Sequence, residues 1–179
     1  MVRHWTRLGL ALAMAACALP SSSVLNSGAL TVDEYTRRQL TAAAGTLVRY
    51  RSQALVHSNR ERRRIPHEVL GVVISPQLAR VQESAVRELE NRNRAPVAGG
   101  PAFTGARTRL DAARAVREGD RITLDAVEHT EVRYGSGKLV QSVRRRFEFT
   151  AVGDAITLTG ERVVDPDARP INDPDPRDR

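Results

Sequence analysis

The stretch RITLDAVEHTEVR (residues 121–133) alternates between two sets of side chains, one mostly apolar and one mostly charged. Successive side chains of a strand point to opposite faces of a sheet, so this pattern predicts a β-strand with one buried and one solvated face. The face predicted to be buried carries Ile122, Leu124, Ala126, Glu128, Thr130 and Val132. Glu128 and Thr130 are the polar exceptions on that face.

Three more strands are predicted around this one, at 107–117, 138–151 and 155–164. The turn signals EGD (118–120), GSG (135–137) and VGD (152–154) separate them. In 138–151 one face carries Val143, Arg145, Phe147, Phe149 and Ala151. Short turns join antiparallel neighbours, so the four segments are predicted to form an antiparallel meander.

A first helix is predicted from a capping box formed by Thr31 and Glu34 to about residue 57. Gly45 inside it costs about 1 kcal/mol relative to Ala, which indicates that another segment approaches closely there. The arginines of this helix are expected to lie mostly away from its apolar stripe: Arg37, Arg38, Arg49 and Arg51.

A second helix is predicted to begin at Ser75 and Pro76, a cap followed by a residue suited to the first turn. Its apolar stripe is Leu78, Val81, Ala85 and Leu89. The run EVLGVVIS (68–75) between the helices is too short for a helix and is interpreted as extended chain packed on the core.

These elements predict an α+β fold in which two N-terminal helices pack on a curved four-stranded antiparallel sheet. This layout is that of the cystatin-like and nuclear-transport-factor-like cone folds, because only the two helices are available to cover the apolar sheet face. The folded domain is expected to span residues 31–164. Residues 165–179, DPDARPINDPDPRDR, are rich in Pro and Asp and are interpreted as a linker-like tail.

The N-terminus resembles an export signal over residues 1–16, followed by a tether at 17–30. Cys17 is the sole cysteine, so no internal disulfide can form. The preceding LAMAA resembles a bacterial lipobox, which would make Cys17 a lipid-anchoring residue, although Met14 departs from the usual Leu. Cleavage after ACA (16–18) would instead release the protein. The expected location is therefore the cell envelope or the extracellular space.

The chain carries 27 Arg, one Lys and a formal net charge of +7. Most of the positive charge lies on the predicted domain, whereas the tail carries five Asp against three Arg. Such a body is attracted to anionic envelope polymers or phospholipid head groups by nonspecific Coulomb forces. Nucleic acid is not an expected partner, because Phe147 and Phe149 of VRRRFEF fall on the core-facing register and export removes most nucleic acid.

Three phrases resemble the N-terminal region of secreted actinobacterial proteins that carry a papain-type amidase-like domain after it. They are GVVISPQLARVQESAVRELENR (71–92), FTGARTRLDAARAVREGDRITLDAVEHTEVRY (103–134) and VVDPDARPINDP (163–174). The resemblance implies a leader region that precedes an enzyme. Papain-type chemistry needs a cysteine thiolate beside a histidine, and no cysteine follows Cys17, so the resemblance implies no catalytic residue here.

One candidate site is an inward pair of Glu128 and Arg145, which interrupt the apolar faces of neighbouring strands. The alternative is that both lie beyond the helices and contact water. Asp125, His129 and Glu131 share the opposite face and are expected to form a solvated outer surface, because one His with a carboxylate makes a poor metal site. No metal or cofactor is expected.

The function predicted from these observations is that of an exported, non-enzymatic accessory or binding domain of the cell envelope. Its partner would be an envelope component or an amidase domain. One alternative is a basic adaptor for anionic cell-wall polymer or phospholipid. Another is a minor hydrolase that uses Glu128 or His129.

Overall fold

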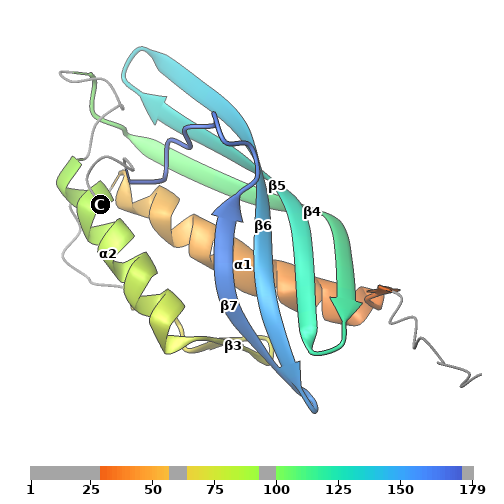
Figure 1. Ribbon diagram of the computed structural model, residues 1–179. Helices are drawn as coiled ribbons and strands as arrows, with labels where there is room; N and C mark the ends of the chain where they lie inside the picture. The colour runs from red at the N-terminus through yellow and green to blue at the C-terminus, as the bar shows by residue number, and fades with distance from the viewer. Residues whose placement is uncertain (1–28, 57–63, 93–99, 175–179) are drawn as a thin grey trace, which may run out of the picture.

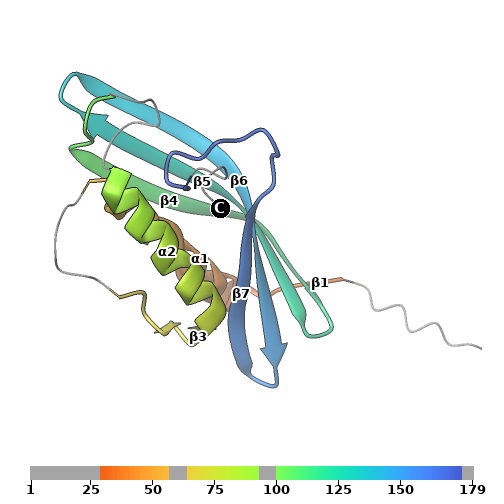
Figure 2. The ribbon, with the colours of Figure 1, turned by 60° about the vertical axis from the view of Figure 1, so that its left-hand side comes forward.

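The computed structural model describes residues 29–56, 64–92 and 100–174. Two long helices lie on one face of a twisted sheet (Figures 1 and 2). The helices are α1 (Glu34–Ala54) and α2 (Pro76–Arg92). The long strands are β4 (Gly105–Glu118), β5 (Arg121–Tyr134), β6 (Gly137–Val152) and β7 (Ala155–Val163). The short strands are β1 (Leu30–Thr31), β2 (Glu68–Val69) and β3 (Val72–Ile74).

The four long strands form consecutive antiparallel hairpins at the positions predicted for them. Gly119 and Gly153 occupy the left-handed region at two of the turns, with φ of 59° and 58°. The ladders shift register between Ala112 and Arg114 and between Glu148 and Phe149. Such bulges increase local twist and bend a strand, which lets the sheet curve around the helices.

The predicted fold class was wrong, because the sheet is mixed and has seven strands in the order β1-β4-β5-β6-β7-β3-β2. β3 pairs with β7 in parallel, so the sheet is neither four-stranded nor wholly antiparallel. Two of the three extra strands come from EVLGVVIS, which folds into a β2–β3 hairpin whose turn residues Leu70 and Gly71 have φ of 50° and 83°, and the third is β1. Two- and three-residue strands are too short to give an alternating sequence signal.

The start of α1 also differs from the predicted capping box. Asp33, not Thr31, is the N-cap, and its carboxylate accepts a hydrogen bond of 2.9 Å from the Thr36 amide. Thr31 pairs with Val116 in β1, and Val32 N donates to Ala115 O at 3.2 Å. Pairing with β4 therefore holds Thr31 in an extended strand.

The main core lies between α1 and the sheet. α1 contributes Leu40, Ala43, Ala44, Leu47 and Val48, and the sheet contributes Leu124, Phe147, Phe149 and Leu158, all of them buried. Phe147 and Phe149 are thus core residues, as predicted. A Cβ added at Gly45 would lie 3.8 Å from Leu110 Cβ, an ordinary packing distance. α1 therefore lies close to β4, yet Gly45 is not required by that approach.

A second apolar cluster lies near the C-terminal ends of both helices. It consists of Ala54, Leu55, Leu89, Phe103, Val132 and Ile171. On α2 the buried positions include Leu78, Ala85 and Leu89, as predicted, but Val81 is 50% exposed and Gln82 is 4% exposed. Within the described residues, no helix is long and apolar enough to cross a membrane.

Candidate functional site

A group of charged and amide side chains lies buried between α1, β5, β6, β7 and the segment that follows β7. We call it the buried polar cluster, and it comprises Arg51, Glu128, Arg145, Glu161, Asn172 and Asp173. Arg145, Glu128 and Asn172 are each 1% exposed. Burying charged groups is costly unless they are paired, so the contacts within the cluster determine its role.

The structure brings Glu128 and Arg145 together, with Arg145 Nε donating to Glu128 Oε2. Glu128 lies opposite Val143 and Arg145 lies opposite Ala126, so the two side chains meet diagonally across the ladder. They are not placed beyond the cover of the helices, which was the alternative considered. The alternation of β5 places Glu128 on the inner face, where Arg145 of the neighbouring strand β6 neutralises it.

Glu161 on β7 is the second carboxylate of the cluster. Its Oε1 accepts a bond of 2.7 Å from Arg145 Nη1 and another from Arg51 Nη2, while its Oε2 accepts a bond of 3.0 Å from Gln82 Nε2. Glu161 lies opposite the buried Phe147, which places it on the inner face of the sheet. Arg51 is 4% exposed, so the expectation that it lies away from the core was wrong.

The segment after β7 completes the cluster, crossing from the end of β7 toward the C-terminal end of α1 (Figures 1 and 2). Asp173 accepts bonds of 3.1 and 3.2 Å from the two terminal nitrogens of Arg145, and its Oδ1 lies 3.3 Å from Arg51 Nη1. Asn172 Nδ2 donates to Glu128 Oε1 and, at 2.9 Å, to Ser52 Oγ. Two side chains of this segment thus contact both arginines and one of the glutamates.

The described part of the predicted tail is therefore not a free linker. Ile171 is 3% exposed and belongs to the second apolar cluster. Gln141 on β6 accepts from the Ile171 amide and donates to the Arg169 carbonyl, both at 2.9 Å. This docking could not be predicted from the sequence, because Pro, Asn and Asp are also the residues typical of loops.

Arg145 lies at the centre of the cluster and is surrounded by carboxylates. Burial alone lowers the pKa of Arg145, but the nearby carboxylates of Glu161, Asp173 and Glu128 outweigh it and raise that pKa above its ordinary value. Two guanidinium groups face three carboxylates in the cluster. Arg145 therefore acts as a permanent cation at its centre.

A chain of hydroxyl groups extends the cluster toward β4. Ser52 Oγ contacts Thr108 Oγ1, which lies 3.0 Å from Thr130 Oγ1, and Thr130 donates to Glu128 Oε1 at 2.9 Å. Glu128 thus accepts hydrogen bonds from Arg145, Thr130 and Asn172. A carboxylate engaged by three donors is poorly placed to take a proton from a substrate, which disfavours the hydrolase alternative for Glu128.

The outer face of the sheet carries ion pairs at the positions predicted to be solvated. Asp125 accepts from Arg146 at 2.7 Å, and Glu131 accepts from Arg133 at 2.8 Å. His129 is 35% exposed at its side chain. In the described part of the chain, no three His, Cys, Asp or Glu residues are grouped so as to hold a metal ion.

His129 also joins a row of polar residues across three strands that the sequence analysis did not predict. Its Nδ1 lies 2.8 Å from Ser142 Oγ on β6, and its Nε2 lies 3.4 Å from Asp111 Oδ2 on β4. A Ser, a His and an Asp in such a row are the residue types that acyl-transfer enzymes use. That chemistry also needs oriented hydrogen-bond donors for the developing oxyanion. The row lies on the middle of a sheet whose strands are paired along these positions, so its geometry favours a cross-strand surface contact.

Cys17, the predicted lipid-anchoring residue, and the predicted export signal lie outside the described residues. Comparison with protein families finds no family that matches the chain. Comparison with curated proteins finds no relative either.

Proposed function

We propose that the protein is an exported, non-enzymatic accessory domain of the cell envelope that holds the chain around residue 174 in a fixed position on its surface. The observation that carries this proposal is the pairing of Asn172 and Asp173 with Arg51, Arg145 and Glu128 inside the fold. A domain of this kind positions a partner that follows or binds the docked segment. This partner is an amidase domain or another envelope component.

The chemistry of the contacts supports a positioning role. An apolar plug would tolerate a shift of the segment by a residue, because hydrophobic contact is not directional. The Asp173 carboxylate binds two guanidinium groups, and the Asn172 amide binds a hydroxyl and a carboxylate. These directional contacts can all form only when the segment is docked in one register. Buried charged groups can specify a unique arrangement at some cost in stability, which suits a segment that must leave the domain at a defined place.

The envelope location is supported by the sequence. Residues 1–16 have the pattern of an export signal, and Cys17 follows a lipobox-like LAMAA. The phrases shared with leader regions of amidase-like proteins include INDP (171–174), the stretch that docks onto the body. A leader that fixes the start of the next domain accounts for both observations.

The test is a distance distribution between spin labels on the sheet and on the docked segment. In a Cys17→Ser background, labels at Thr150→Cys on β6 and at the exposed Arg169→Cys should give a single narrow distribution. Its width should match that of a control pair at Thr150→Cys and Val140→Cys, two exposed positions of the same strand. The additional change Asp173→Asn should broaden the first distribution only. A broad first distribution before that change would refute the positioning role.

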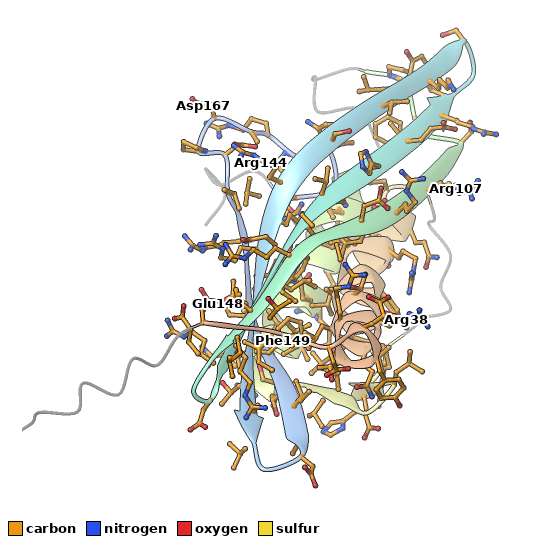
Figure 3. All side chains as sticks on the ribbon, turned by 90° about the vertical axis from the view of Figure 1, so that its right-hand side faces the viewer. Arg38, Arg107, Arg144, Glu148, Phe149 and Asp167 are labelled. Atoms are coloured by element: carbon orange, nitrogen blue, oxygen red, sulfur yellow. The ribbon has the colours of Figure 1, made fainter. Side chains whose placement is uncertain are left out.

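A second candidate is the basic adaptor for anionic polymer or phospholipid, and one observation favours it. Within the described residues, three exposed arginines of β4 and β5 form no ion pair: Arg107, Arg114 and Arg121. Figure 3 shows Arg107 projecting away from the sheet. Binding to phosphatidylglycerol vesicles would fall steeply between 0.01 and 0.5 M salt, over which the screening length shortens from about 30 Å to a few Å. Replacing all three arginines with Gln should abolish that binding, and salt-insensitive binding would contradict the adaptor function.

A further inference from the structure

The contacts of Ile171, Asn172 and Asp173 have the form of a peptide bound in a receptor site. Ile171 enters the second apolar cluster, Asn172 exchanges hydrogen bonds with polar groups of α1 and β5, and Asp173 binds two guanidinium groups. We infer that the body contains a recognition site for a peptide with an apolar residue followed by Asn and Asp. This site is occupied by the chain's own segment and is able to exchange it for the same sequence supplied in trans.

The way the segment is attached supports exchange. Beyond Val164, whose amide donates to Arg144 O, the segment folds on itself through backbone hydrogen bonds from Ala168 N to Asp165 O and from Asp173 N to Pro170 O. The Gln141 side chain of the body binds the segment at Ile171 N and Arg169 O, and Asn172 and Asp173 bind the body through their side chains. A strand that completes a ladder is part of the sheet, whereas a short turn held by side chains resembles a peptide ligand.

The charge of the site also supports exchange. Without the segment, Arg51 and Arg145 still face Glu128 and Glu161, which leaves a neutral quartet of paired charges. Release of Asp173 therefore leaves Arg51 and Arg145 each paired with a remaining carboxylate, which lessens the usual obstacle to opening a buried ion pair. The same arrangement defines the ligand: a carboxylate bound by both arginines, and an amide one residue earlier that donates to Glu128 and Ser52.

Three subsites set the specificity of this site. The apolar subsite is lined by residues that include Leu55, Leu89, Phe103 and Val132. The amide subsite needs a donor and an acceptor, because Asn172 Oδ1 also accepts from Arg145 Nη2 at 3.3 Å. Asp in place of Asn172 would set a carboxylate against that of Glu128, and Asn in place of Asp173 would lose the charge that the arginines bind. The inference rests on the docking proposed above and adds that the docked segment is replaceable.

The experiment uses the full chain with a site-specific protease sequence inserted between Asp167 and Ala168, which is cleaved after purification. A fluorescein-labelled peptide of residues 168–179 is added in excess, and its uptake is followed by anisotropy. Unlabelled peptide should displace it, whereas peptides with Asn172→Leu or Asp173→Asn should compete about 10- to 100-fold less well, the range expected for a hydrogen bond to a charged group. Arg169→Gln is the matched control, because within the described residues the Arg169 guanidinium binds the carbonyl oxygens of Pro166 and Ala168 and no group of the buried polar cluster.

On the body, Gln141→Ala should speed release of the peptide, because it removes two contacts without touching the buried charges. Failure of the cleaved chain to take up peptide, or equal competition by all the peptides, would overturn the inference. A narrow spin-label distribution in the intact chain together with no exchange would leave the positioning role standing alone. A broad distribution in the intact chain would refute both.

Discussion

Removing Arg145 should destabilise the fold more than removing Glu128, its closest partner. The two guanidinium groups of the cluster face three carboxylates. Arg145→Met leaves all three carboxylates with Arg51 as their one cation. Glu128→Gln leaves two carboxylates with two cations. Breaking a buried pair by removing one partner typically costs about 3–5 kcal/mol, and we expect that cost for Arg145→Met. Glu128→Gln should cost about 1–3 kcal/mol, because its amide cannot accept from all three of the present donors.

The assay is urea denaturation followed by circular dichroism, with unfolding free energies compared at unchanged slope. The double variant should be less destabilised than the sum of the single variants, because its net charge equals that of the original cluster. Arg144→Met is the matched control: Arg144 is the next residue on β6, it is exposed, and it pairs with Asp165, so little change is expected. Figure 3 shows Arg144 on the side of the sheet where the segment leaves β7. Equal losses for Arg145→Met and Glu128→Gln would refute the charge argument.

Four further changes test local features of the fold. Gly45→Ala should stabilise the protein by up to about 1 kcal/mol in urea titrations, because the added methyl group meets only ordinary contacts and Ala favours helix. A loss of stability would show that the site is tighter than the distance of 3.8 Å to Leu110 Cβ implies. Leu70→Asn should raise the melting temperature by relieving about 1 kcal/mol of strain at φ 50°, and a fall would contradict that reading. Ile171→Ala should cost about 2–4 kcal/mol and make the chain after residue 164 sensitive to protease, whereas continued resistance would argue against docking. The hydrogen bond from Arg144 lowers the pKa of Asp165 below its ordinary 3.8. The contribution of this pair to the free energy of unfolding should therefore be present above pH 3.8 and disappear as the pH falls through the lowered pKa. Asp165→Asn should flatten the acid limb of a curve of stability against pH.

Alternation along residues 107–164 was enough to predict the four long strands, because a sheet covered on one face imposes a two-residue period. The same reasoning offered Glu128 and Arg145 as an inward pair but left open that both contact water. It did not predict β1, β2 and β3, whose two or three residues pair only because the folded sheet offers its edges. A single sequence carries no local signal for such pairing.

The rest of the buried polar cluster was missed for a related reason. Arg51 is one of several arginines on an amphipathic helix, and its burial depends on a carboxylate 110 positions away. Asn172 and Asp173 lie in a Pro-rich stretch whose composition is typical of a linker. Only tertiary contact distinguishes a docked loop from a free one.

Backbone ¹⁵N relaxation of the full chain shows whether residues 171–173 belong to the folded body, by comparing Ile171, Asn172 and Asp173 with the middle of β5. If they do, their order parameters should be about 0.85, as in rigid strands. Values below about 0.6 would show a segment that moves independently of the cluster and would refute the docking.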